Sequence, residues 1–144
     1  MRIKLLTLSL LLFVLLGCRK HRNHCRDCIT FNYNGDQRQY LIHVPNTLSV
    51  NAPLVFMLHG YTGNASNIKE YIGLDEVASS QNFVVCYPQG SLDNDNTPHW
   101  NARLSISSTD DIGFLSALAQ HLQTQYNLDP NKTYTGGFSN GGFM

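Results

Sequence analysis

Close to the end of the chain, one short motif has the residue types and the spacing for nucleophilic catalysis. Gly137-Phe-Ser-Asn-Gly141 is a G-x-S-x-G sequence, and Gly142 follows it. Directly after a strand, this sequence forms a sharp turn that projects the serine hydroxyl above the sheet. Side chains two residues before and after the serine would collide in that turn, which accounts for both glycines. Ser139 is therefore a candidate nucleophile, able to attack a carbonyl and form an acyl-enzyme.

A nucleophile of this kind also needs hydrogen-bond donors for the oxyanion that forms during attack. The turn leaves the backbone N–H of Asn140, just after the serine, directed at that oxyanion. A second donor is expected from the loop after an earlier strand. His59-Gly-Tyr-Thr-Gly63 follows an apolar run, and Gly60 lets its backbone come close. We predict the N–H of Tyr61 as the second donor, with Thr62 as the next choice.

The histidines and paired acids before Ser139 have structural interpretations. In the fold typical of G-x-S-x-G, the chain order is Ser, then acid, then His, so His59 is interpreted as bracing the oxyanion loop. Three other histidines belong to no motif: His43, His99 and His121. They are interpreted as surface residues, or as core residues whose ring nitrogens are hydrogen-bonded within the protein. Asp110 and Asp111 could serve metal or acid–base chemistry, but their place at a helix start favours capping and the helix dipole. No metal and no cofactor is predicted.

The elements that must position these residues alternate between strand and helix. Residues 29–33 and 38–44 alternate around Asn34-Gly-Asp36, which predicts an antiparallel hairpin at a sheet edge. Residues 53–58 and 83–87 are continuous apolar runs, typical of strands that are covered on both faces. A further strand, more polar than these two, is expected to begin at residues 133–135. The sequence therefore predicts an α/β fold, with a mostly parallel sheet and helices on both faces.

Two helices are expected between these strands, and a long polar loop covers residues 88–107. The first helix spans residues 67–80, with a buried face formed by Ile68, Tyr71, Ile72 and Val77. The second spans residues 110–126, where Ser108 or Thr109 can cap the first N–H groups. Its apolar residues at helical spacing are Ile112, Leu115, Leu118, Leu122 and Tyr126.

The first 17 residues are interpreted as a signal peptide. Arg2 and Lys4 precede an apolar run over residues 5–17, which suits a secretory signal better than a helix spanning a bilayer. A simple membrane anchor is the alternative. Leu15-Leu-Gly-Cys18 resembles the bacterial lipobox, which implies cleavage before Cys18 and lipidation of that residue. We predict an exported lipoprotein, at the outer surface, in the periplasm or extracellular, whose only membrane contact is the lipid.

Residues 18–28 are polar and are interpreted as a tether between the lipid and the domain. Cys25-x-x-Cys28, with His21 and His24 nearby, could form a zinc or redox site, but a disulfide is favoured in an oxidising compartment. Cys86 is interpreted as a buried core thiol. The ten basic and ten acidic residues cancel, which excludes a general nucleic-acid-binding surface.

Six blocks along residues 29–144 resemble the poly(3-hydroxybutyrate) depolymerase-like esterases. These enzymes include the feruloyl and acetylxylan esterases of carbohydrate esterase family 1. The resemblance implies an α/β-hydrolase fold and a serine esterase acting on a carboxylic ester: a polyhydroxyalkanoate, a feruloylated or acetylated polysaccharide, or a small soluble ester. It also implies that Trp100 lies near the substrate cleft and that Asp110 and Asp111 are structural. The blocks are 53–60, 87–90, 100–101, 110–115, 126–130 and 137–142.

The acid and the histidine that would activate Ser139 are expected after the nucleophile elbow, the turn from Gly137 to Gly141, and the sequence ends at Met144. We therefore interpret residues 29–144 as the N-terminal half of an esterase domain and expect this chain by itself to be inactive. A second hypothesis is a non-catalytic, surface-anchored binding module that keeps the cleft.

Overall fold

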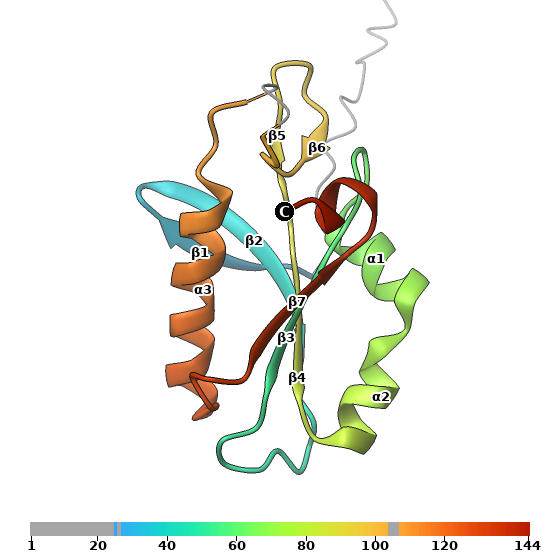
Figure 1. Cartoon of the computed structure of the whole chain (residues 1–144), viewed down its shortest axis with the longest axis vertical. Coiled ribbons are helices and arrows are strands. Elements are labelled where there is room, and N and C mark those ends of the chain that lie inside the picture. Colours follow the sequence, from blue (N-terminus) through green and yellow to red (C-terminus); the bar gives the residue numbers. More distant parts are fainter. Residues whose placement is uncertain (1–24, 26, 104–106) are drawn as a thin grey trace, which may run out of the picture.

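The computed structural model describes residue 25, residues 27–103 and residues 107–144. Within these residues a five-stranded sheet lies between helices, and a small two-stranded sheet stands at one end of it (Figure 1). The elements are β1 (Ile29–Tyr33), β2 (Asp36–His43), β3 (Leu54–Leu58), α1 (Ala65–Ile72), α2 (Leu74–Gln81), β4 (Val84–Pro88), β5 (Ser91–Leu92), β6 (Pro98–His99), α3 (Asp111–Tyr126), β7 (Thr133–Gly137) and the 3₁₀ helix η1 (Ser139–Gly142). The predicted α/β class is confirmed.

The strand order in the main sheet is β1-β2-β4-β3-β7. β1 and β2 form the expected antiparallel hairpin at one edge, and their turn places Asn34 and Gly35 at φ 52° and 91°, which Asn and Gly tolerate best. β2 also pairs antiparallel with β4, whereas β4, β3 and β7 are mutually parallel. β7 is the outer strand of the described sheet.

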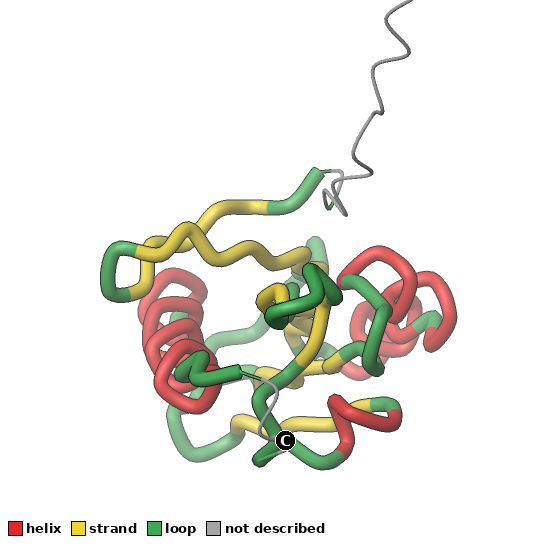
Figure 2. Tube along the Cα trace, turned by 90° about the horizontal axis from the view of Figure 1, so that it is seen from above, coloured by secondary structure: helices red, strands yellow, loops and turns green. Residues whose placement is uncertain are grey.

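Both faces of β4 are buried, as its continuous apolar run predicts, whereas β3 is buried on one face and half-buried on the other. Leu54, Phe56 and Leu58 of β3 belong to a core with Phe114, Leu118 and Leu122 of α3. Val85 and Tyr87 of β4 belong to a second core, with residues of α1 and α2. Successive strand residues point to opposite faces, so one strand serves both cores. The helices accordingly lie on the two sides of the sheet (Figure 2).

The segment expected to be one helix over residues 67–80 is two short helices. Gly73 adopts φ 60° and ends α1 in the left-handed conformation, which restarts the helical period in α2. The predicted buried face is correct for Ile68 but wrong for Tyr71, Ile72 and Val77, of which Tyr71 is 76% exposed. Small residues, Ala65 in α1 and Ala78 in α2, are buried against the sheet instead.

The second predicted helix is α3, but its cap and part of its buried face differ from the expectation. Asp110 itself is the N-cap, and its carboxylate accepts a hydrogen bond from the N–H of Gly113 at 2.9 Å, in place of Ser108 or Thr109. Ile112 is 66% exposed, whereas Phe114, which the expected face omitted, is buried. The buried face of α3 is rotated by one residue relative to the expectation, because Asp111 takes the buried position in place of Ile112 and forms an ion pair with Arg38.

Cys25 and Cys28 form a disulfide, as favoured from the sequence, and Cys86 is a buried free thiol. Cys25 packs with Ala65 and Ile68 in the second core, so this part of the predicted tether belongs to the folded domain. Cys18 and the predicted signal peptide lie outside the described residues. Among the described residues, no helix is long and apolar enough to cross a membrane.

Candidate active site

The residues singled out by their chemistry meet at one end of the sheet. β3, β4 and β7 are parallel, so the segments that follow them emerge at the same edge. These segments are the turn at residues 59–63, the loop at residues 89–101 and η1 (Figure 1). The sequence predicted the first and the last as partners, and the structure places the loop between β4 and α3 at the same edge.

Ser139 stands on a strained turn between β7 and η1. Its φ is 48°, a left-handed conformation that is rare for a residue with a Cβ, and the residue is exposed to solvent. Phe138, just before it, donates its backbone N–H to Leu58 O at 3.0 Å, which ties the turn to the end of β3. The tight turn therefore presents the serine outward on a backbone that the neighbouring strand holds in place.

The two glycines of the motif are required by close backbone contacts. A Cβ on Gly137 would lie 2.2 Å from Gly141 O, across the turn. A Cβ on Gly141 would lie 2.5 Å from His59 O and 2.7 Å from Leu58 O. No side chain fits at either position without movement of the backbone, and the contacts of Gly141 press the elbow directly against the turn that starts at His59.

The turn at residues 59–63 leaves the backbone N–H of Tyr61 unengaged beside the elbow. Gly63 donates to Gly60 O at 3.0 Å, and Thr62 donates to Pro98 O at 2.9 Å, so the Thr62 N–H is already used. The Tyr61 N–H makes no hydrogen bond within the described part of the chain. Asn140 is the second residue of η1, and the first N–H groups of a helix have no partner within it. The backbone N–H groups of Tyr61 and Asn140 thus both remain available.

The side chain of Tyr61 is held by the loop between β5 and β6. Its hydroxyl donates to the carboxylate of Asp93 at 2.8 Å, and the same carboxylate accepts the N–H of Thr97 at 2.8 Å. These hydrogen bonds, that of Thr97 first, hold the pKa of Asp93 below its usual range. The loop therefore fixes the orientation of the Tyr61 ring next to the elbow.

His59 is buried, and both its ring nitrogens are bonded to backbone. Nε2 accepts the N–H of Gly90 at 2.9 Å, so Nδ1 carries the proton and donates it to Gly60 O at 2.7 Å. Burial lowers the pKa of His59, which keeps the ring neutral at pH 7. This arrangement agrees with the interpretation of His59 as a residue that braces the turn.

The other histidines also have local partners. The ring of His99 is buried and bonds Ser91 O at 3.0 Å and Ser107 Oγ at 2.5 Å. His43 bonds Ser79 Oγ at 2.7 Å, and the ring of His121 lies 5.2 Å from that of Phe31. In the described residues there is no group of three or more His, Cys, Asp or Glu that could hold a metal ion.

Trp100 lies beside the elbow but beneath the surface. Its side chain is fully buried, and its indole N–H donates to His59 O at 2.9 Å. The side-chain amide of Asn140 pairs with the backbone of Trp100: its oxygen accepts the Trp100 N–H at 2.7 Å, and its nitrogen donates to the Trp100 carbonyl at 3.0 Å. Trp100 therefore supports the site from within and exposes no surface to a substrate here.

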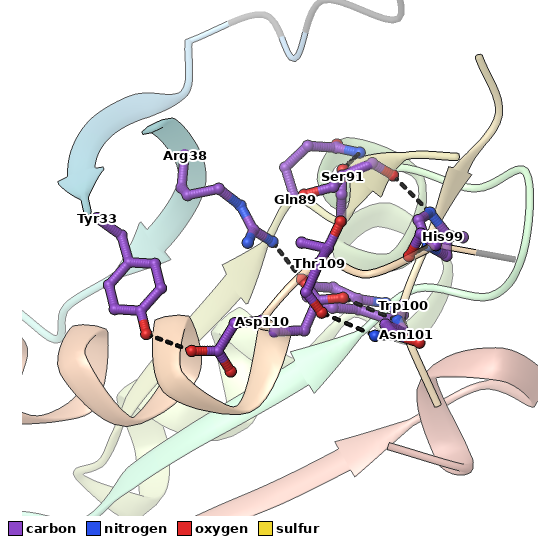
Figure 3. A network of polar contacts seen from close by, with 12 residues as sticks. Tyr33, Arg38, Gln89, Ser91, His99, Trp100, Asn101, Thr109 and Asp110 are labelled. Carbon is purple, nitrogen blue, oxygen red and sulfur yellow. Dashed lines mark hydrogen bonds and ion pairs between the residues drawn. The ribbon is translucent and has the colours of Figure 1, made fainter. Parts of the chain in front are cut away.

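A buried ion pair anchors the same segment to α3 and β2. Arg38 donates to Asp111 at 2.6 Å, and the other oxygen of Asp111 accepts the N–H of Asn101 at 2.8 Å. Asn101 also donates to Thr109 O at 2.8 Å, and Tyr33 donates to Asp110 at 2.6 Å (Figure 3). Asp110 and Asp111 therefore have the structural role that the resemblance implies. Their partners Tyr33, Arg38 and Asn101 could not be predicted from the sequence.

No family model matches the chain. Among curated proteins, it is 31% identical over 117 residues to poly(3-hydroxyalkanoate) depolymerase C of Paucimonas lemoignei, a match that covers 79% of this chain and 28% of that protein. It is 30% identical over 110 residues to the bifunctional acetylxylan esterase/xylanase XynS20E of Neocallimastix patriciarum, with 76% and 15% covered. Feruloyl esterase B of Thermothelomyces thermophilus is 26% identical over 149 residues, with 97% and 48% covered.

Among solved structures, a thermostable esterase superposes with a TM-score of 0.65 at 20% identity, covering 81% of this chain and 35% of that one. At that identity the likeness shows the fold, and the predicted α/β-hydrolase fold is confirmed. The sequence matches make the chain a distant homologue of these esterases, as its motifs suggested. The chain spans less than half the length of each of these relatives.

Proposed function

We propose that the whole protein, to which residues 29–144 contribute the nucleophile, is a serine esterase that hydrolyses carboxylic esters through an acyl-enzyme, with Ser139 as the nucleophile. The observation that carries the proposal is the conformation of Ser139. An exposed serine at φ 48° lies between a parallel strand and a helix start, flanked by two glycines that admit no side chain. Strain of this kind persists only where the surrounding structure imposes it, and it concentrates at functional sites.

The backbone N–H groups of Asn140 and Tyr61 are the proposed oxyanion donors. They come from η1 and from the turn after β3, which the contacts of Gly141 with His59 O and Leu58 O bring together. Both are backbone groups, so they need no reorganisation when charge develops on the substrate oxygen. Thr62 is not a donor in this proposal, because its N–H is bonded to Pro98 O.

His59 is not the general base in this proposal, although it lies next to the site. A base must accept the serine proton on a free ring nitrogen. Both nitrogens of His59 are bonded to backbone groups of Gly60 and Gly90. The base is therefore a different residue, oriented in turn by a carboxylate.

The substrate proposed is an ester of a carboxylic acid, in polymeric or small soluble form. The names of the homologues cover polyhydroxyalkanoate, acetylxylan and feruloyl esters, and we transfer only the shared carboxylic ester linkage. A panel of poly(3-hydroxybutyrate) film, acetylated xylan, feruloylated arabinoxylan and an aryl acetate distinguishes these substrates by the rate of acid release.

The decisive experiment is labelling of the full-length protein with a fluorophosphonate, followed by peptide mapping. We expect the label on Ser139, and we expect Ser139→Ala to lose both labelling and ester hydrolysis, on the order of 10⁴-fold or more. Ser107→Ala is the matched control, because among the described residues Ser107 is bonded only to the ring of His99. Labelling or turnover that persists in Ser139→Ala would exclude Ser139 as the nucleophile.

We also propose export as a lipoprotein anchored through Cys18, on the sequence of residues 1–18 alone. The test is metabolic labelling with a fatty acid in a bacterial host, with fractionation of membranes. We expect Cys18→Ala to lose the label, and an acylated, membrane-bound Cys18→Ala protein would contradict the proposal.

A further inference from the structure

The segment from Pro98 to Asn101, which we call the bridge segment, is hydrogen-bonded to both halves of the proposed oxyanion hole. From the turn after β3, Thr62 N–H donates to Pro98 O at 2.9 Å. In the other direction, the Trp100 indole N–H donates to His59 O of the same turn at 2.9 Å. From the elbow, the side chain of Asn140 pairs with the backbone of Trp100 through two hydrogen bonds. One segment thus connects two loops that are far apart in the sequence.

The pairing of Asn140 with Trp100 needs an amide. It requires one acceptor and one donor on the same short side chain, at 2.7 Å from the Trp100 nitrogen and 3.0 Å from the Trp100 oxygen. Both residues are buried, Asn140 being 3% exposed and Trp100 not at all. In such surroundings the hydrogen bonds are strong, and a missing partner is costly.

The bridge segment is itself fixed to the framework. Asn101, at its end, is bonded to Asp111 and to Thr109 at the start of α3 (Figure 3). Asp111 is in turn paired with Arg38 of β2. Because α3 and, through Asp111, β2 hold this end of the bridge segment, the segment can fix the positions of the two loops that are bonded to it.

We infer that the side chains of Asn140 and Trp100 are positioning residues, which set the spacing between the Asn140 and Tyr61 N–H groups through the bridge segment. The inference rests on the proposed function. Oxyanion donors act only within a narrow range of distance from the developing charge. The two donors belong to different loops, so the distance between them depends on the contacts that hold these loops together, which include the hydrogen bonds of the bridge segment. A misplacement of about 1 Å costs roughly 100-fold in rate.

The test exploits the protonation of an aspartate at this position. In Asn140→Asp the backbone N–H remains, but an ionised carboxylate faces the Trp100 carbonyl and repels it. When protonated, the same side chain has one donor and one acceptor and restores the pairing. We expect kcat at pH 8 to fall about 10- to 100-fold with KM nearly unchanged, because the oxyanion exists only beyond the ground state. The ratio of variant to wild-type kcat should then rise as the pH is lowered.

A second variant and a control separate positioning from loss of stability. Trp100→Phe keeps an aromatic, though smaller, ring and removes the donor to His59 O, and we expect a similar fall in kcat. Leu122→Ala creates a cavity in the α3 core, about 16 Å along the helix from Asp111. It should lower the melting temperature without lowering kcat well below that temperature. Equal losses of kcat in Leu122→Ala and Asn140→Asp would overturn the inference.

Backbone amide exchange tests the inference independently of turnover. In Asn140→Asp at pH 8 we expect faster exchange at Trp100 and also at Thr62, whose N–H is bonded to Pro98 O of the bridge segment. Unchanged exchange at Thr62, or a kcat ratio that does not vary with pH, would overturn it. If Ser139→Ala kept its turnover, the proposed function would fail instead, and the exchange data would still decide whether the bridge segment couples the two loops.

Discussion

Replacement of Arg38 by methionine should strongly lower the free energy of unfolding, although Arg38 lies in an edge hairpin near the start of the domain. The side chains of Arg38 and Asp111 are 7% and 0% exposed, and their charged atoms are 2.6 Å apart. The guanidinium also lies 3.8 Å above the ring of Phe114. Arg38→Met leaves Asp111 buried, with the N–H of Asn101 as its remaining donor. Breaking a buried pair on one side costs about 3–5 kcal/mol in the free energy of unfolding.

Urea denaturation measures this loss, and Trp100, the single tryptophan, is a buried fluorescent reporter beside the ion pair. With a denaturant slope of about 1–3 kcal/mol/M, the loss corresponds to a midpoint lowered by at least about 1 M. Lys132→Met is the matched control, because the pair of Lys132 with Asp129 is exposed on the lysine side and is worth under about 1 kcal/mol.

The double variant Arg38→Met/Asp111→Leu decides whether the loss comes from the uncompensated charge. Removal of both charges should recover a large part of the stability that Arg38→Met loses, because no buried ion remains. The reasoning is refuted if Arg38→Met shifts the midpoint no more than Lys132→Met does, or if the double variant is as unstable as the two single losses added together.

Two further predictions concern the backbone of the elbow and the alkaline limit of stability. Gly141→Ala should abolish ester hydrolysis and lower the melting temperature, because the new Cβ would lie 2.5 Å from His59 O. Gly73→Asn is the control and should change both little, because Gly73 has φ 60°, which Asn tolerates, and no atom lies within 4 Å of its Cβ position. Equal effects of the two variants in calorimetry and turnover would contradict this prediction. Burial raises the pKa of Tyr40 to about 12, so the folded state holds this proton more tightly than the unfolded state, and stability should be lost as the pH rises from about 10 to 12. Urea midpoints measured over that range should fall less steeply in Tyr40→Phe, and identical slopes would show that Tyr40 does not contribute.

The local sequence was sufficient for the elements and for the elbow. Continuous apolar runs predicted β3 and β4, and Asn34-Gly35 predicted the hairpin turn, because each depends on the chemistry of neighbouring residues. The same holds for Gly137, whose Cβ would collide with Gly141 O across the turn, whereas the collision that Gly141 avoids is with Leu58 O and His59 O, which are distant in the sequence. The motif is therefore enough to identify Ser139 as a candidate nucleophile.

Exposure of individual helix residues was decided by the fold. Tyr71 and Val77 were expected inside because they match a helical period, but the left-handed Gly73 breaks that period between α1 and α2. Ile112 was expected inside for the same reason, yet Asp111 takes the buried position through its pairing with Arg38. The spacing of apolar residues along one helix does not predict which of its faces is buried when a residue distant in the sequence pairs with it.

The sequence alone thus determined that a strained serine turn would follow a strand of a parallel sheet, because steric limits on a few consecutive residues fix such a turn. Only the tertiary structure decided what holds that turn in place. Asn140 meets Trp100 across 40 residues, and Arg38 meets Asp111 across 73. Polar side chains such as these satisfy partners brought near by packing, and nothing in their immediate sequence specifies which partner that will be.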